Sequence, residues 1–552
     1  MRNIERSLKV STFKPKFFTC MKNYSLSQFY KDITAGVIVA IIALPLSIAL
    51  AIASGVSPEK GLHTAIIAGF FISFLGGSRV QIGGPTGAFM VIVSGIIAEH
   101  GLEGLIISTI LAGVILVLMG VFRLGSIIKF IPYPITTGFT SGIALVIFST
   151  QIKDFFGLSI EEVPSEFIEK WESYILNINK INWTSVLLGV AALLIIIYWP
   201  KVNRKIPGSL VALIVTTLIA YFFKLDVDTI GSKYGELSSA LPMPKLPNIS
   251  IATVKKLLQP AFTIALLGGI ESLLSAVVAD GMIGGKHRSN TELIAQGAAN
   301  IASGLFGGIP ATGAIARTAA NVKNGGRTPV AGMVHALVLL LIMVLFMPYA
   351  KLIPLTSLAA ILMVVAYNMS EWRAFKSLLS APKSDIFVLL ATFALTVLID
   401  LVVAIEIGMV LAALLFMKRM ADVTQVQYVS MDLDDVDSDT PLRDTVSKDV
   451  LVYEINGPFF FGAADKFAEV IEQVQGPAKV LILKMNLVPA MDATAIHAMN
   501  KLRKTCKASK TKLILTGVKA QPYSALEKAG FIDKLGEGAV FESLEEALEK
   551  AS

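Results

Sequence analysis

Apolar runs of membrane-spanning length fill most of the chain between residues 33 and 417. A helix needs about 20 mainly apolar residues to cross a bilayer, and about fourteen such segments occur here, some short enough to need tilting or a break. Their approximate centres are residues 43, 69, 92, 112, 143, 191, 216, 270, 299, 317, 338, 361, 392 and 410. The sequence therefore predicts a polytopic α-helical membrane protein.

The composition agrees with this prediction and excludes other classes. Hydrophobic residues make up 54% of the 552 positions and charged residues only 16%, which is unusual for a soluble protein of this size. The net charge of +7 does not indicate nucleic-acid binding, because the basic residues lie mostly between the apolar runs. Two cysteines, Cys20 and Cys506, provide no disulfide framework.

The loops between the segments alternate in charge. With the N-terminus in the cytoplasm, one side holds Arg79, Arg123, Lys129, Lys201, Arg204, Lys205, Lys286, Arg288, Lys323, Arg327, Arg373, Lys376, Lys418 and Arg419. The opposite side holds Glu59, Glu99 and the acid-rich stretch 154–172. Because cytoplasmic loops are enriched in Lys and Arg, we expect both termini in the cytoplasm of a bacterial cell and the helices in its inner membrane. No cleavable signal peptide is evident, so residues 1–31 are interpreted as a cytoplasmic tail.

One glycine-rich motif occurs twice within this apolar region, as GGPTGAF at residues 83–89 and as GGIPATGA at residues 307–314. Interrupted hydrophobic segments at matching places in two halves of a membrane protein indicate broken helices at an inverted-repeat interface. The N-terminus of a half-helix carries unpaired N–H groups and a partial positive charge. Two such ends that meet at one point would form a binding site for a small anion.

The expected orientations support this interpretation. Numbered along the chain, segment 3 runs outward and segment 10 runs inward, so the helices that follow Thr86 and Thr312 would meet near the midplane. The pattern predicts a seven-plus-seven inverted repeat over roughly residues 33–224 and 260–417.

The composition changes after residue 419. Residues 420–449 contain a run of Asp and Ser without apolar periodicity, which indicates a linker. Short apolar strands at residues 450–455, 480–483 and 512–516 alternate with helical stretches, a pattern typical of a small cytoplasmic α/β domain over residues 450–552. The transmembrane domain would then span residues 32–419.

Two charged residues within the apolar segments are candidate functional groups. Glu271 lies in the middle of an apolar stretch, and an intramembrane carboxylate is costly enough to suggest a functional role, here as a proton carrier. Ser275 follows one turn later on the same helix face. Arg317 follows Thr312 within a stretch of Ala, Ile and Thr, where it would add positive potential behind the anion site or pair with Glu271. Structural alternatives are a carboxylate that caps backbone donors and an arginine that extends to the interface.

Other classes of chemistry find no support in the sequence. The five histidines show no metal-ligand spacing, so neither a metal nor a cofactor is predicted. No Walker motif and no pairing of a nucleophile with a base appear, so we expect no enzyme and no ATP-driven pump. Asp492 is expected to cap a helix in the C-terminal domain, and the hydroxyl of Thr494 near that helix start is a candidate phosphorylation site.

Several stretches resemble the sulfate permease (SulP) family of secondary anion transporters. They are ALPLSIA at residues 43–49, QIGGPTGA at 81–88, IES at 270–272 with DG at 280–281, and AIART at 314–318. The C-terminal part resembles the STAS domain, with DATA at residues 492–495 in its signature loop. The resemblance covers nearly the whole chain in the expected order.

The resemblance implies a core domain of segments 1–4 and 8–11 and a gate domain of segments 5–7 and 12–14. Substrate would bind between half-helices 3 and 10 and cross the membrane by an elevator-like displacement of the core. The implied substrate-binding residues are Leu46, Leu50, Thr86, Gly87, Ala88, Ser275, Thr312, Gly313, Ala316 and Arg317, with Glu271 for proton coupling. The family also implies a homodimer with cytoplasmic STAS domains.

Two departures from the family patterns refine these expectations. Many sulfate-type members have Gln where this chain has Leu46, so this site is more apolar. Sodium-coupled bicarbonate members resemble a pattern with Asp and Thr at the positions of Glu271 and Ser275, and Ile315 offers no side-chain oxygen. Proton coupling through Glu271 is therefore favoured over sodium coupling.

The leading hypothesis is a proton-coupled or exchanging transporter of sulfate, with bicarbonate or a C4-dicarboxylate as alternative substrates. A nucleobase permease shares the broken-helix architecture, but the STAS-like tail and the Ala316–Thr318 stretch disfavour it. A membrane-anchored signalling scaffold is a third hypothesis, and the paired half-helices argue against it.

Overall fold

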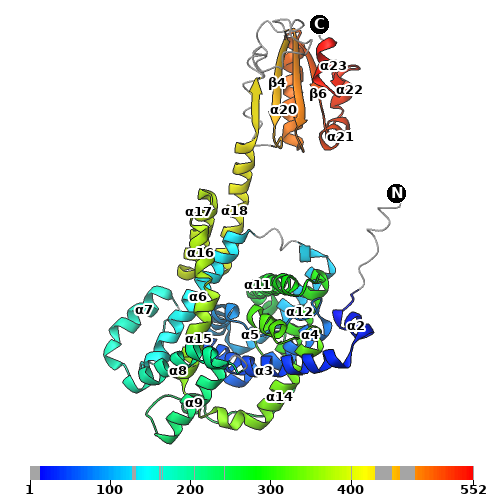
Figure 1. Ribbon diagram of the computed structural model, residues 1–552. Helices are drawn as coiled ribbons and strands as arrows, with labels where there is room; N and C mark the ends of the chain where they lie inside the picture. The colour runs from blue at the N-terminus through cyan, green and yellow to red at the C-terminus, as the bar shows by residue number, and fades with distance from the viewer. Residues whose placement is uncertain are drawn as a thin grey trace. The chain divides into compact units, whose positions relative to one another are not determined.

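The computed structural model describes residues 13–126, 132–160, 163–164, 166–203, 206–240, 243–399, 401–428, 450–460 and 479–550. The chain divides into two compact units, Met1–Met409 and Val410–Ser552. The first unit is almost entirely helical, and the second contains a sheet (Figure 1).

The helices of the first half of the membrane unit follow the hydropathy pattern. They are α2 (Lys16–Cys20), η1 (Met21–Asn23), α3 (Leu26–Ala53), α4 (Pro58–Leu75), η2 (Gly87–Phe89), α5 (Met90–Val121), α6 (Tyr133–Phe156), α7 (Phe167–Leu176), η4 (Ile178–Lys180), α8 (Trp183–Val202) and α9 (Gly208–Phe222). Inside α5, Gly101 has a φ of 68° and interrupts the helix, which separates the expected segments 3 and 4.

The second half repeats this organisation. Its helices are α10 (Ile230–Tyr234), α11 (Ile251–Ile283), α12 (Ser289–Leu305), α13 (Ile315–Lys323), α14 (Val330–Ala350), α15 (Leu355–Met369), α16 (Trp372–Leu378), α17 (Lys383–Leu398) and α18 (Leu401–Val423). Every expected segment centre falls inside one of these helices or those of the first half. The predicted polytopic helical fold is confirmed.

Seven spans in the described part of the chain are long and apolar enough to cross a membrane. They are Leu26–Ala53, Gly87–Val121, Tyr133–Phe156, Trp183–Val202, Ile251–Ile283, Val330–Ala350 and Leu355–Leu378. Polar side chains mark the starts of several of them: Ser25 accepts from the Gln28 backbone N–H before α3, and Ser250 accepts from that of Thr253 before α11.

The helices pack in two groups that correspond to the expected core and gate. In the core, α5 lies against α11 and α12, while α14 lies against α3 and α4; in the gate, α6 lies against α15 and α17, and α8 lies against α9. Glycines permit the closest approach of α5 and α12, because a Cβ on Gly113 would lie 2.6 Å from the Gly297 carbonyl oxygen.

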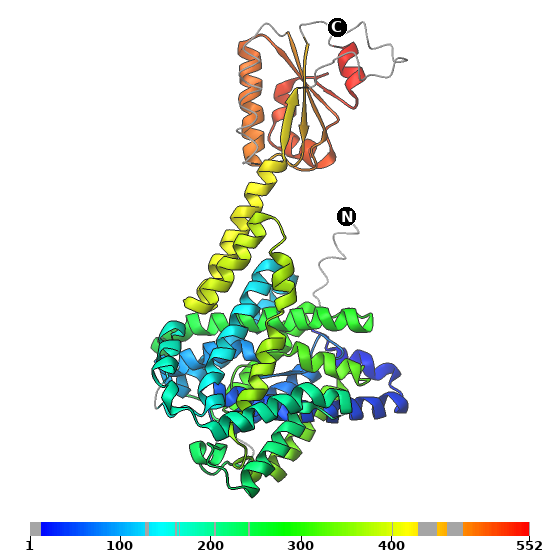
Figure 2. The same cartoon turned by 60° about the vertical axis from the view of Figure 1, so that its left-hand side comes forward.

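The second unit is a mainly parallel sheet with helices on both faces. Its strands are β3 (Gln425–Tyr428), β4 (Val450–Asn456), β5 (Val480–Leu487), β6 (Lys512–Thr516) and β7 (Val540–Phe541), in the order β3-β4-β5-β6-β7. Only β3 is antiparallel to its neighbour. The helices are α20 (Ala493–Ala508), α21 (Ala520–Lys528), α22 (Phe531–Leu535) and α23 (Leu544–Glu549) (Figure 2).

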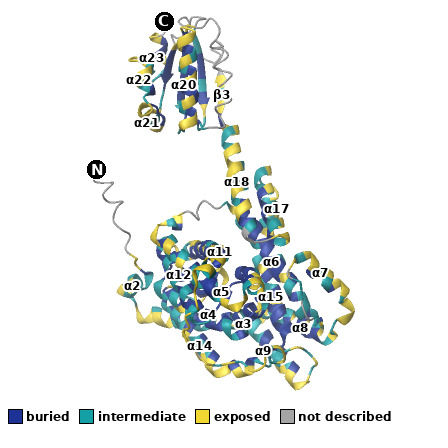
Figure 3. Ribbon diagram, turned by 180° about the vertical axis from the view of Figure 1, so that it is seen from behind, coloured by how far each residue is buried: buried dark blue, intermediate teal, exposed yellow. Residues whose placement is uncertain are grey.

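Each face of this sheet buries its own apolar cluster. Leu481, Leu483 and Leu515 pack with residues of α20, whereas Val452, Ile482 and Ile514 pack with α23. The alternation along each strand produces this division, because successive side chains point to opposite faces. Figure 3 shows the resulting pattern, with buried strands and an exposed outer side of α20.

The structure differs from the expected boundaries at two junctions. Helix α3 begins at Leu26, inside the expected tail, and both the end of α18 and β3 occupy residues 420–428 of the expected linker. The end of an amphipathic helix and an edge strand of four residues are too short to show a clear hydrophobic periodicity, so the sequence pattern does not distinguish them from a linker. Residues 429–449, Lys129, Arg204 and Lys205 lie outside the described residues, as do residues 1–12, 461–478 and 551–552.

Candidate functional site

The two copies of the glycine-rich motif lie side by side in the core. A short antiparallel ladder joins β1 (Gly83–Gly84) to β2 (Thr312–Gly313), with Gly83 opposite Gly313 and Gly84 opposite Thr312. The ladder continues through the backbone N–H of Ala314, which donates to the Ile82 carbonyl at 2.8 Å. Segments more than 220 residues apart in sequence are therefore held in register.

A helix begins directly after each strand of this ladder. Thr86 is extended, and η2 and α5 follow it, while Ala314 is extended and α13 follows it. The first N–H groups of a helix have no partner within the helix, so both helix starts present donors beside the ladder. This arrangement fits the binding of a small anion.

Helix α11 supports both motif copies with neighbouring turns. The Thr86 hydroxyl donates to Glu271 Oε2 at 2.9 Å, and the Thr312 hydroxyl donates to the Gly268 carbonyl at 2.7 Å. Glu271 is half-buried. The intramembrane carboxylate that the sequence singled out therefore contacts the residue that immediately precedes one half-helix.

Arg317 lies behind the first motif copy. Its side chain is 3% exposed, and Nη2 donates to the Pro85 carbonyl at 2.5 Å. Nη1 faces Gly84 and has no hydrogen-bond partner among the described residues. Arg317 and Glu271 form no salt bridge within the described part of the chain, so the guanidinium contributes positive potential without neutralising the carboxylate.

The other expected residues surround this centre to different extents. A Cβ on Gly87 would lie 3.9 Å from Leu50 Cδ2, so Leu50 reaches the start of η2. Ala88 is buried beside it. Ser275 is fully buried, and its hydroxyl lies 3.4 Å from that of Thr318 on α13.

Three expected residues are less closely connected to the site. Leu46 is half-buried in an apolar cluster of α3, α4 and α14. Ala316 is exposed on α13, one position before Arg317. Thr494 is exposed near the start of α20 in the other unit, where Asp492 accepts a hydrogen bond from the Ala495 backbone N–H at 2.8 Å.

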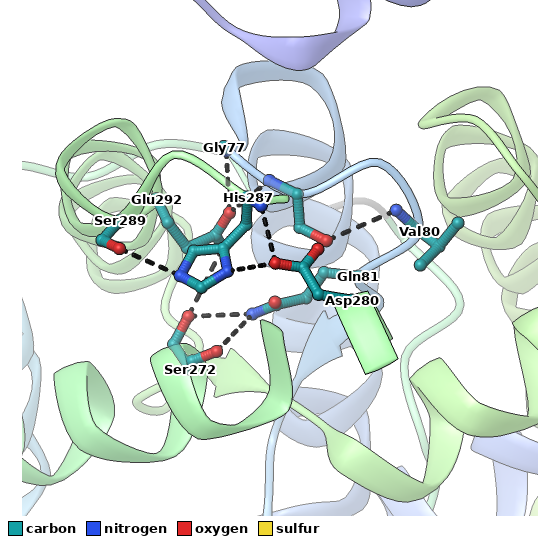
Figure 4. A network of polar contacts seen from close by, with 9 residues as sticks. Gly77, Val80, Gln81, Ser272, Asp280, His287, Ser289 and Glu292 are labelled. Carbon is teal, nitrogen blue, oxygen red and sulfur yellow. Dashed lines mark hydrogen bonds and ion pairs between the residues drawn. The ribbon is translucent and has the colours of Figure 1, made fainter. Parts of the chain in front are cut away.

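A second buried carboxylate in the core was not predicted. Glu292 on α12 is fully buried, and its Oε2 accepts hydrogen bonds from the backbone N–H groups of Gly77 and Ser78 at 2.8 and 2.9 Å. Its Oε1 accepts from Gln296 Nε2 at 3.0 Å. The Ser272 hydroxyl lies 3.4 Å from the same oxygen, as Figure 4 shows. The signal in the sequence is a carboxylate and an amide one turn apart within an apolar segment. With every oxygen satisfied, Glu292 holds the turn that leads into β1.

Gln81 links this network to the ladder. Its Nε2 donates to the Ser272 hydroxyl at 2.8 Å, and a Cβ on Gly313 would lie only 1.8 Å from the same nitrogen. A glycine is therefore required opposite Gly83 because the amide occupies the space of a side chain.

Hydrogen bonds also stabilise the loop that connects α11 and α12. His287 Nδ1 lies 2.7 Å from Asp280 Oδ2, and His287 Nε2 lies 3.0 Å from the Ser289 hydroxyl (Figure 4). Likewise, buried Asp32 accepts from the Thr328 hydroxyl at 2.6 Å and so joins α3 to the start of α14. No group of metal-ligating side chains occurs among the residues that the structure describes.

Comparison with known proteins identifies both units. The profile of the sulfate permease family matches residues 29–392, and that of the STAS domain matches residues 442–547. YvdB of Bacillus subtilis, provisionally named a sulfate transporter, is 45% identical over 533 residues, covering 96% of this chain and 99% of YvdB. The bicarbonate transporter BicA of Picosynechococcus is 32% identical over 546 residues, covering 94% of each chain.

The fold also matches a solved structure over its full length. The murine anion transporter Slc26a9, in an inward-facing state, superposes with a TM-score of 0.86 at 20% identity, covering 100% of this chain and 97% of that one. At this identity the similarity concerns the fold.

Proposed function

This chain belongs to the sulfate permease family, and we propose that it is a secondary active transporter whose substrate is a small anion, sulfate in the first instance. The observation that carries the proposal is the β1–β2 ladder, which aligns the two helix starts that follow Thr86 and Ala314. The name of YvdB favours sulfate as the first substrate to test.

The anion would bind in front of the ladder, between the two half-helices. Backbone donors at both helix starts, together with the Thr86 hydroxyl, supply hydrogen bonds. Arg317 adds a full positive charge from behind Gly84 and Pro85. Donors of this kind recognise charge and size, which suits a compact inorganic anion. Leu46 and Leu50 would form the apolar side of the site, and Thr312, Gly313, Ala316 and Ser275 its remaining wall.

Glu271 would couple transport to protons. Its carboxylate lies 2.9 Å from the Thr86 hydroxyl, so an anion bound there would approach a negative charge. Protonation of Glu271 removes that repulsion and favours binding of anion and proton together. This coupling is a symport in which the proton gradient drives anion accumulation.

The division of helices into core and gate supports an elevator-like movement. Both motif copies and Glu271 belong to core elements, and within the core they are joined by the ladder and by α11. The site would therefore move as one body past the gate helices. We further propose a homodimer in a bacterial cytoplasmic membrane, with both termini cytoplasmic and with Thr494 accessible for phosphorylation.

Bicarbonate is the second candidate substrate. The similarity to BicA over 94% of the chain is the observation that favours it. The replacement of the sodium-type Asp and Thr by Glu271 and Ser275 argues that a bicarbonate carrier of this sequence would not need sodium.

Uptake of radiolabelled sulfate into proteoliposomes tests the proposal. The purified protein is reconstituted with an inward proton gradient and without sodium. We expect accumulation that a protonophore abolishes and that Glu271→Gln loses, whereas the exposed control Glu99→Gln retains it. Gradient-driven accumulation by Glu271→Gln would reject the coupling role. Absence of sulfate uptake, with uptake of labelled bicarbonate, would move the substrate assignment to bicarbonate.

A further inference from the structure

The segment before α3 is attached to two distant parts of the core. The Lys16 backbone N–H donates to the Gly76 carbonyl at 2.9 Å, immediately after α4. Arg288, immediately before α12, donates through its backbone to the Gly77 carbonyl at 3.0 Å and through Nη1 to the Lys14 carbonyl at 2.6 Å. The chain around Lys14–Lys16, the turn after α4 and the start of α12 therefore form one junction.

Three basic side chains come together at this junction. Lys16 and Arg288 belong to the hydrogen-bonded segments themselves, and Arg79, which is exposed, follows Gly77 by two residues. Burial lowers the pKa of Lys16, and the positive charges of Arg288 and Arg79 lower it further. Lys16 therefore lies close enough to both arginines for their charges to act on it.

The charge of Asp280 raises the pKa of Lys16 and so offsets part of the cluster, but three cations face this one carboxylate. Asp280 is engaged by His287, and Glu292 is engaged by the Gly77 and Ser78 backbone N–H groups. Within the described ranges, no carboxylate oxygen forms an ion pair with Lys16, Arg79 or Arg288. The junction therefore keeps an excess of positive charge that an external anion can neutralise.

An aromatic surface adjoins the basic cluster. Phe17, next to Lys16, has its ring 5.1 Å from that of Phe74 on α4, and Phe70 stacks on Phe74 at 5.9 Å. Phe18 is 54% exposed and Phe70 is 37% exposed. Basic groups beside exposed aromatic rings are the combination by which proteins bind the boundary between lipid headgroups and acyl chains.

We propose that Lys16, Arg79 and Arg288 form a binding site for the phosphate of an anionic phospholipid headgroup, whose acyl chains lie along Phe18 and Phe70. The lipid would neutralise the repulsion among the three cations and join the N-terminal segment to the turn that leads into β1. The site uses none of the residues assigned to substrate or proton binding, so its test is independent of the proposed transport function.

Thermal unfolding of the full-length protein in neutral detergent micelles tests this site. Phosphatidylglycerol is added in increasing amounts, with phosphatidylcholine as the zwitterionic comparison. We expect phosphatidylglycerol to raise the midpoint temperature of unfolding. In the double variant Lys16→Gln with Arg79→Gln, the phosphatidylglycerol concentration that gives half of this rise should increase by about 25-fold, or about fivefold for each charge removed. The control Arg373→Gln with Lys376→Gln removes the same number of positive charges from the exposed face of helix α16 and should change this concentration little.

Three results would overturn the proposal. They are an unchanged response in the Lys16 and Arg79 variant, an equal loss in the control variant, and an equal stabilisation by inorganic phosphate at the same phosphate concentration. The last result would indicate a site for a free anion. Arg79→Gln alone, at an exposed position, keeps the test valid if the double variant does not fold, and about a fivefold weakening is then expected.

Discussion

Replacing Gly84 with Ala tests whether the contact between the two motif copies is tight. Gly84 has a φ of 155°, a conformation that residues with a Cβ rarely adopt. A Cβ there would also lie 2.4 Å from Arg317 Nη1, well inside van der Waals contact. The guanidinium must then move, and its hydrogen bond to the Pro85 carbonyl is lost.

The two costs can be estimated separately. Backbone strain of this kind costs about 1 to 3 kcal/mol. Loss of a buried hydrogen bond from a charged donor costs about 1.5 to 3 kcal/mol. The free energy of unfolding should therefore fall by about 2.5 to 6 kcal/mol, the sum of the two costs, which corresponds to a decrease of roughly 5 to 12 °C in the unfolding midpoint at about 2 °C per kcal/mol.

Thermal unfolding of the purified protein and anion uptake in proteoliposomes measure the effect. Gly281→Ala in α11 is the control, because no atom lies within 4 Å of its added Cβ. When Arg317 is already replaced by Gln, Gly84→Ala should cost only the backbone strain. The loss of unfolding free energy in the double variant should therefore be smaller than the sum of the two single losses by about 1.5 to 3 kcal/mol. Additive effects, or a Gly84→Ala midpoint equal to that of Gly281→Ala, would refute the reasoning.

Three further predictions concern stability. Glu292→Ala should lower the unfolding free energy by about 2 to 5 kcal/mol, since two buried N–H groups lose their acceptor. Glu292→Gln keeps an acceptor oxygen and should therefore lose less stability than Glu292→Ala. An equal loss in both variants would contradict this prediction. Asp492→Ala should cost about 1 kcal/mol and speed hydrogen exchange in the first turn of α20, which Asp492→Asn should restore. Burial raises the pKa of Cys506 from 9.0 to about 11. The unfolded thiol therefore ionises first, and the STAS unit should lose stability from about pH 9 to pH 11, but not in Cys506→Ala.

The helices and their order could be predicted because hydropathy is a local property. Each apolar run identifies one segment, and the break at Gly101 lies between the expected centres 92 and 112. The repeated Gly-Gly and Thr-Gly-Ala pattern also identified the two half-helices, since glycine, proline and threonine mark an interrupted helix wherever it lies in the fold. Family membership follows from the same short stretches.

The partners of the charged residues could not be predicted, because they come from distant parts of the chain. Arg317 bonds to Pro85 across 232 positions, and Glu292 bonds to Gly77 across 215. Arg288 reaches Lys14 across 274 positions. The sequence by itself determined which segments span the membrane and where their helices break. Only the tertiary structure decided which carboxylates are satisfied and which cations remain unneutralised, because these properties depend on packing between segments that have no local signal for one another.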